Sequence, residues 1–180
     1  MEKRLVPIIG RSSSGKSTLI KELSDRGYQT LAEMPRIILD LRKQQDISLA
    51  ESLTKQSLMY EVQKTFENYA SGLVFLDRSM IDIYAFTDFL CGFIPSYFET
   101  KGAVVQKYSA VFDLESLKFE SDGRIEQDSY CADKIHDFAR SAYTRNGLNP
   151  ILVPSFNNLG LEESVKKRAD FILEKLGELK

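Results

Sequence analysis

The chain has 180 residues, a net charge of −2 and an isoelectric point near 5.6, with 43% hydrophobic and 28% charged residues. This length suits one domain with a full core, and the composition excludes a disordered or collagen-like chain. Lys and Arg are scattered along the chain, so the basic patch that nonspecific nucleic-acid binding needs is missing. We therefore expect one domain over residues 1–180, with a small-molecule partner and no nucleic acid.

The N-terminus and the cysteines bear on cellular location. Only five apolar residues, Leu5 to Ile9, follow the first four residues, too few for a signal-peptide core. No run approaches the roughly 18 apolar residues that would span a bilayer. Cys91 and Cys131 show no pairing pattern, and a single histidine, His136, leaves too few ligands for a zinc site. These features predict a cytoplasmic protein with no membrane segment.

Short apolar segments alternate with stretches of helical periodicity along the chain. Helices are expected from the loop after the first apolar segment to Gly27, from Ser48 to about Ser71, and from about Met80 and Ser129 onward. The alternation predicts an α/β fold with a parallel sheet, helices on both faces and a ligand site beyond the carboxyl ends of the strands. The predicted strands are 5–9, 28–32, 73–76, 110–114 and 150–153.

Two details of these elements are open to a structural test. Pro7 lies within the first predicted strand, where it removes one backbone donor from the ladder. In the helix after Ser48, four residues recur on one face and are expected in the core. They are Met59, Val62, Phe66 and Tyr69.

The first loop carries the sequence G-R-S-S-S-G-K-S from Gly10 to Ser17, which matches the phosphate-loop (Walker A) pattern G-x-x-x-x-G-K-[ST]. Its glycines let the backbone N–H groups turn toward phosphate oxygens, and the following helix adds its positive dipole end. Lys16 would span the β- and γ-phosphates, and Ser17 would offer a hydroxyl to Mg²⁺. The predicted cofactors are ATP, with GTP as an alternative, and Mg²⁺. The predicted nucleotide-binding residues are Gly10, Arg11, Ser12, Ser13, Ser14, Gly15, Lys16, Ser17 and Thr18.

Charged residues follow two other predicted strands. Asp77 ends the segment 73–77, where it either helps to hold the Mg²⁺ bound by Ser17 or is a solvated strand-end residue. Arg78 either binds phosphate or orients Asp77 through a salt bridge. Asp82 either faces the site or stabilises the N-terminus of the next helix.

Glu33 and Arg36 follow the second predicted strand. The carboxyl end of a parallel strand favours a role for Glu33 in the site. Helix capping and plain solvation are the alternatives for both residues, because Pro35 is placed to open a helix at its first turn.

Four segments together resemble a P-loop family of predicted AAA-type ATPases related to the ribosylnicotinamide kinase domain of NadR, and more distantly deoxynucleoside and thymidylate kinases. They are 10–18, 33–36, 77–79 with Asp82, and 163–173. The resemblance implies the P-loop NTPase fold with a kinase-type strand order of 2-3-1-4-5. It also implies that Asp77 is the metal-linked acid, that Arg78 contacts phosphate, and that Glu33 activates the accepting hydroxyl. Arg36 and Asp82 are then expected at the acceptor.

The same resemblance places a lid at 115–128. This segment is acidic, with Lys118 and Arg124 as its cations, and differs in this from arginine-rich lids. Arg124 lies in a turn-forming stretch, so it either closes over the nucleotide and contacts the transferring phosphate or stays a solvated residue. No N-K-x-D sequence occurs, which disfavours the commonest GTPase class without excluding GTP.

The leading functional hypothesis is a Mg-ATP-dependent phosphotransferase that acts on a small nucleoside, nucleotide or similar metabolite. Lys16, Mg²⁺, Arg78 and Arg124 would neutralise phosphate charge, while Glu33 or Asp77 would take the proton of the acceptor. Two alternatives share the phosphate loop. One is an NTPase that drives a conformational switch, and the other is a nucleotide sensor that acts through a protein partner.

Overall fold

The computed structural model describes residues 3–32, 49–98, 105–117 and 129–178. Its sheet has five parallel strands in the order β2-β3-β1-β4-β5, which confirms the predicted fold class and strand order. Each predicted strand is present, with ends shifted by one or two residues. The strands are β1 (Arg4–Gly10), β2 (Gln29–Leu31), β3 (Leu73–Asp77), β4 (Phe112–Leu114) and β5 (Ile151–Val153).

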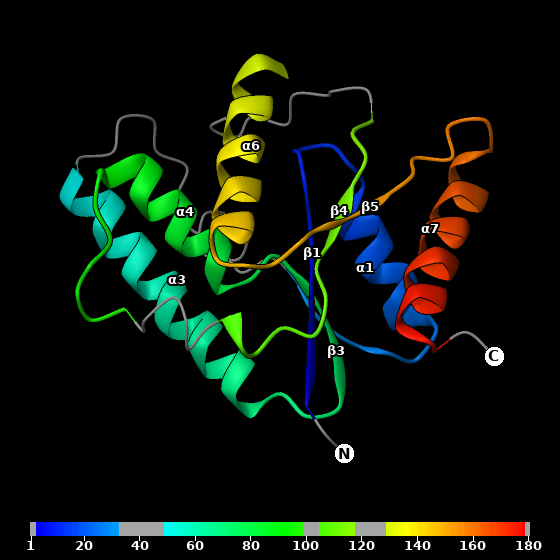
Figure 1. The fold of residues 1–180 in the computed structure, drawn as a ribbon, viewed down its shortest axis with the longest axis horizontal. Coiled ribbons are helices and arrows are strands. Elements are labelled where there is room, and N and C mark those ends of the chain that lie inside the picture. Colours follow the sequence, from blue (N-terminus) through cyan, green and yellow to red (C-terminus); the bar gives the residue numbers. More distant parts are fainter. Residues whose placement is uncertain (1–2, 33–48, 99–104, 118–128, 179–180) are drawn as a thin grey trace.

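Helices cover both faces of the sheet (Figure 1). The chain folds this way because β1 is apolar on both sides: Leu5 and Ile9 belong to one buried cluster, and Val6 and Ile8 belong to the other. The first cluster packs under α3, α4 and α6, and the second under α1 and α7. The helices are α1 (Lys16–Asp25), α3 (Leu49–Tyr69), α4 (Met80–Cys91), α6 (Ser129–Arg145) and α7 (Leu161–Leu176).

Pro7 is accommodated by the way β1 pairs with β4. The Ser109 N–H donates to the carbonyl of Leu5, so the odd-numbered residues of β1 direct their backbone groups toward the β4 side. The ladder with β4 begins only at Ile8, opposite Phe112. Leu5 pairs with Tyr108 in an isolated bridge, and Pro7 lies between this bridge and the ladder, where it is paired with no residue of β4.

The buried face of α3 differs from the predicted one. Met59 is buried as expected, but Val62 is only half-buried, Phe66 is 48% exposed and Tyr69 is 86% exposed. The prediction for these three residues was wrong because three polar residues are buried on α3 in their place. The buried residues of this helix are Gln56, Met59, Tyr60, Gln63 and Glu67.

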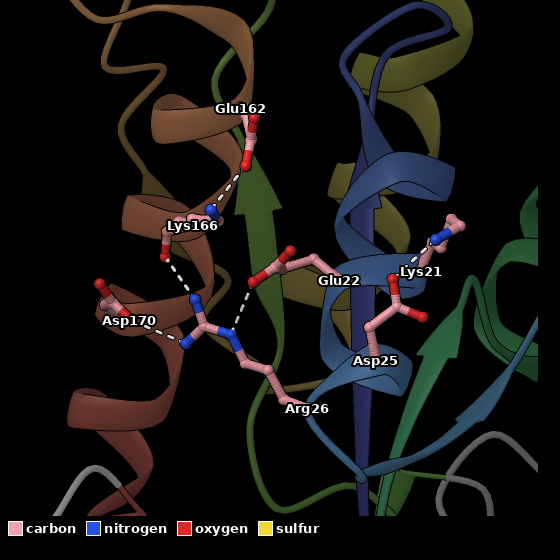
Figure 2. Close-up of polar contacts among 7 residues, drawn as sticks. All are labelled: Lys21, Glu22, Asp25, Arg26, Glu162, Lys166 and Asp170. Atoms are coloured by element: carbon pink, nitrogen blue, oxygen red, sulfur yellow. Dashed lines mark hydrogen bonds and ion pairs between the residues drawn. The ribbon is translucent and has the colours of Figure 1, made fainter.

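Arg26, the C-cap of α1, joins the end of α1 to the middle of α7 (Figure 2). The Arg26 guanidinium contacts Glu22 of its own helix at 2.8 Å and Asp170 of α7 at 2.7 Å. It also donates to the backbone carbonyl of Lys166 at 3.2 Å. Arg26 therefore fixes α7 against the helix that follows the phosphate loop.

Within the described residues, no helix is long and apolar enough to cross a membrane.

Candidate nucleotide-binding site

The loop between β1 and α1 needs glycine at both ends. Gly10 has φ 151°, and a Cβ there would lie 2.7 Å from Ser14 Oγ and 3.3 Å from the carbonyl oxygen of Leu114. Gly15 is the N-cap of α1 with φ 85°, in the left-handed region. Both glycines of the sequence motif are therefore required by the fold of the loop itself.

The N-terminus of α1 has features that favour a bound anion. No side chain caps this helix, and its first turn contains no acidic residue, so the positive end of the helix dipole is not offset locally. Lys16 is buried, and its Nζ donates to the carbonyls of Gly10 at 2.8 Å and Arg11 at 2.9 Å. These contacts hold a cation over the loop, where it can bind phosphate oxygens.

Arg168 of α7 is a second cation at the loop. It is 2% exposed, and its guanidinium donates to three backbone carbonyls: Ser14 in the loop at 2.7 Å, Glu115 after β4 at 3.2 Å and Pro154 after β5 at 3.2 Å. Burial lowers the pKa of Arg168, and Glu115 opposes that shift. The loop is thus tied to the carboxyl ends of two further strands, a contact that sequence reasoning missed.

The side chain of Arg11 leads away from α1. Its Nη1 pairs with Asp133 of α6 at 2.9 Å, and its Nη2 donates to the carbonyl of Leu117 at 2.5 Å. Arg11 therefore connects the loop to two segments that flank residues 118–128.

Asp77 and Ser17 meet at the edge of the sheet that carries the loop. Asp77 pairs with Ile8 in the parallel ladder and is buried, and the Ser17 hydroxyl donates to Asp77 Oδ2 at 3.2 Å. Two oxygen donors at this distance fit Mg²⁺, which takes few protein ligands and completes its shell with phosphate oxygens and water. The structure thus brings together the two residues predicted to hold the metal.

Arg78 adopts an unusual backbone conformation directly after Asp77. Its φ of 73° lies in the left-handed region, which costs a non-glycine residue on the order of 1–3 kcal/mol. The guanidinium lies over the ring of Phe86, 5.0 Å from the ring centroid, and its Nη1 is 3.8 Å from Asp82 Oδ1. An ion pair thus joins Arg78 to Asp82.

The N-terminus of α4 is capped completely, unlike that of α1. Ser79 and Asp82 form a capping box: the Ser79 hydroxyl accepts from the Ile81 N–H at 3.1 Å, and Asp82 Oδ2 accepts from the Ser79 N–H at 2.8 Å. The remaining first-turn donor, the Met80 N–H, is bound by Glu67 of α3 at 3.1 Å. Asp82 therefore stabilises this helix N-terminus, as one of its two predicted roles required.

Two buried tyrosines each bind one of the acids at the start of α4, Glu67 or Asp82. The Tyr108 hydroxyl donates to Glu67 at 2.9 Å, and Tyr143 donates to Asp82 and contacts the Ser79 hydroxyl at 2.7 Å. Burial raises the pKa of Glu67 and of Asp82, and it raises the pKa of both tyrosines well above the ordinary value.

Sequence reasoning missed Glu67, although the spacing of Gln56, Gln63 and Glu67 along one side of α3 was a signal for it.

The sequence of residues 5–158 matches the model of a protein family described as AAA domain. The chain belongs to this AAA domain family. A comparison with curated protein sequences finds no match.

Solved structures similar to this AAA domain include two kinases and NadR. A deoxyadenosine kinase from M. mycoides with products dCMP and dCDP bound has TM-score 0.59 and 15% identity, with 98% of this chain and 100% of that chain covered. A thymidylate kinase from Ehrlichia chaffeensis has TM-score 0.65 and 12% identity, with 98% and 100% covered. NadR in complex with NR has TM-score 0.66 and 17% identity, with 98% of this chain and 50% of that chain covered. The likeness confirms the P-loop kinase fold.

Several predicted site residues of this AAA domain lie outside the described residues. They are Glu33, Arg36, Arg124 and most of the segment 115–128. Glu115, the first residue of that segment, is exposed, and its side chain accepts from the Ser155 N–H at 2.6 Å. Hydrogen bonds with Ser155 lower the pKa of Glu115.

Proposed function

We propose that this AAA domain protein is a Mg-ATP-dependent phosphotransferase that acts on a small nucleoside, nucleotide or similar metabolite. The observation that carries the proposal is the meeting of three features at one sheet edge. The uncapped N-terminus of α1 and Lys16 form an anion site, the Ser17–Asp77 pair offers oxygen ligands to a metal, and Arg78 follows Asp77 directly. Phosphoryl transfer needs this combination of positioning and charge neutralisation.

In the proposed reaction, the loop from Gly10 to Thr18 binds the β- and γ-phosphates, and Lys16 offsets their charge. A bound Mg²⁺ would supply positive charge that offsets the charge of the phosphates. Ser17 and Asp77 would hold it, and Arg78 would bind the transferred or accepting phosphate. Glu33, or else Asp77, would take the proton of the acceptor hydroxyl, with Arg36 and Asp82 near the acceptor and Arg124 over the nucleotide.

The structural neighbours support the choice of substrate class. Two of them are a deoxyadenosine kinase and a thymidylate kinase, and the third, NadR, is in complex with NR. Small nucleosides and nucleotides are therefore the first acceptors to test.

The protein should be incubated with Mg²⁺ and γ-labelled ATP, and separately γ-labelled GTP, together with a panel of nucleosides and nucleotides. We expect the label to move to one class of acceptor, and the Lys16→Ala variant to abolish the transfer. Label that appears only in inorganic phosphate would favour the NTPase alternative. Bound nucleotide with no movement of label would favour a nucleotide sensor.

A further inference from the structure

A buried carboxyl group from a different helix is bound to the first residue of α4. Glu67 is 0% exposed, and its Oε1 accepts from the Met80 N–H at 3.1 Å and from Gln63 Nε2 at 2.9 Å. Tyr108 shares this site, because its hydroxyl donates to Glu67 and also accepts from the Met80 N–H at 3.2 Å. Glu67 thus connects α3 and the segment before β4 to the point where α4 begins.

We propose that Glu67 is a positioning residue for phosphoryl transfer, which fixes the turn Asp77–Arg78–Ser79 through the Met80 N–H and Tyr108. The inference rests on the proposed function, since Asp77 and Arg78 are the residues assigned there to metal and phosphate. Glu67 acts through other groups: its side chain binds Gln63, the Met80 N–H and Tyr108.

The turn needs such support because its backbone is strained. Arg78 has a left-handed φ of 73°, and a strained conformation persists only where neighbouring contacts determine it. On the strand side, the Arg78 N–H donates to the carbonyl of Ile8 at 3.2 Å. On the helix side, Asp82 binds the Ser79 N–H and Glu67 binds the Met80 N–H. The turn is therefore held from both ends. Ile8 of β1 binds its strand side, and Glu67 and Tyr108 bind its helix side from outside α4.

A role in folding stability alone explains the buried carboxyl group of Glu67 less well than a positioning role does. The capping box of Ser79 and Asp82 already stabilises the helix N-terminus. Burial of a carboxyl group opposes folding in its charged form, which is why burial raises the pKa of Glu67. An apolar residue of similar length would pack between α3 and α4 without that cost, but it could not accept the Met80 N–H.

The same helix pair contains a matched control. The hydroxyl of Thr87, in the later part of α4, is buried and donates to the Ile83 carbonyl at 2.6 Å and towards Gln56 of α3 at 3.4 Å. Thr87→Val removes this buried bond between the same two helices at nearly constant volume, but it leaves the Asp77–Arg78–Ser79 turn alone.

The test compares Glu67→Met, Glu67→Gln and Thr87→Val with the wild type. The first measurement is amide hydrogen exchange of ligand-free protein at Met80, which requires no activity. We expect at least about tenfold faster exchange in Glu67→Met, and a rate within about threefold of wild type in Glu67→Gln, whose amide oxygen still accepts the N–H. Thr87→Val should leave the exchange at Met80 unchanged.

The second measurement separates binding from turnover, at a temperature where every variant is folded. Glu67→Met should lower kcat by about tenfold or more, because a small displacement of a reacting group is costly, while the Kd for ATP stays within about twofold. Glu67→Gln should restore most of kcat, and Thr87→Val should remain within about twofold. If Glu67→Met does not fold, Tyr108→Phe removes the partner hydroxyl, and a slower reaction with wild-type Kd is expected there too.

Equal losses of kcat in Glu67→Met and Thr87→Val would overturn the inference, as would wild-type exchange at Met80 in Glu67→Met. Failure of the proposed function gives a different result: the wild type itself would then transfer no label, whatever the exchange rates at Met80.

Discussion

The two residues proposed to hold Mg²⁺, Ser17 and Asp77, meet at the edge of the sheet. Each is held by the backbone around it: Ser17 lies in the first turn of α1, and Asp77 is the last residue of β3, paired with Ile8 of β1. Because parallel strands share one carboxyl edge, Asp77 comes within 3.2 Å of Ser17 although 60 residues separate them. Burial of Asp77 strengthens its interaction with any cation bound there.

We predict that Asp77→Asn folds normally but loses Mg²⁺-dependent turnover, because the amide keeps the shape of the carboxylate and lacks its charge. Circular dichroism would check folding, and label transfer would be measured over a range of Mg²⁺ concentrations. Asp25→Asn is the control, since Asp25 is an exposed acid of α1 that pairs with Lys21. Wild-type turnover in folded Asp77→Asn would return Asp77 to the role of a strand-end residue.

At the scale of elements, the two helices that begin at this sheet edge are built in opposite ways. The first turn of α1 has neither a side-chain cap nor an acidic residue, whereas α4 has a capping box and a bond from Glu67. The dipole of α1 is therefore available to an anion, and that of α4 is offset by protein groups. We therefore propose α1 as the phosphate site and α4 as the support for Arg78.

The contact of α7 with the loop gives a prediction at this scale. Arg168→Lys should weaken binding of ATP by about tenfold or more, because an ammonium cannot reach three carbonyls at once and a hydrogen bond to a charged group is worth about 1.5–3 kcal/mol. Arg26→Lys is the control, because Arg26 also binds α7, through Asp170, but lies at the end of α1 away from the loop (Figure 2). It should change the Tm but leave the Kd for ATP within about twofold, and equal changes in Kd would refute a role for Arg168 in shaping the loop.

For the whole molecule, the sequence predicted the parts that depend on local patterns. Apolar segments marked all five strands, and the motif from Gly10 to Ser17 marked the loop, because its glycines are needed by local backbone geometry. The position of Asp77 followed from the common edge of parallel strands. The strand order followed from the resemblance to kinases, and the order in the structure agrees with it.

The sequence could not predict features that depend on distant contacts. The spacing along α3 allows either the face with Phe66 and Tyr69 or the face with Gln63 and Glu67 to be buried. The second face is buried in the structure, where Glu67 binds Tyr108 and the Met80 N–H. These partners lie outside α3, so the sequence of the helix does not reveal them. Arg168 belongs to the run Lys166-Lys167-Arg168, which has the composition of a solvated surface. Only the packing of α7 against the ends of β4 and β5 shows that it is buried.

The central claim is that the loop from Gly10 to Thr18 binds nucleotide phosphates through the charge of Lys16. Titration calorimetry of the wild type and Lys16→Ala with Mg-ATP and Mg-GTP tests it most directly. We predict binding by the wild type and a loss of about 1.5–3 kcal/mol in the variant, or roughly tenfold to hundredfold in Kd, since the contact is a charge-assisted one. Equal affinity of the two proteins for the nucleotide, or no binding by the wild type, would contradict the account.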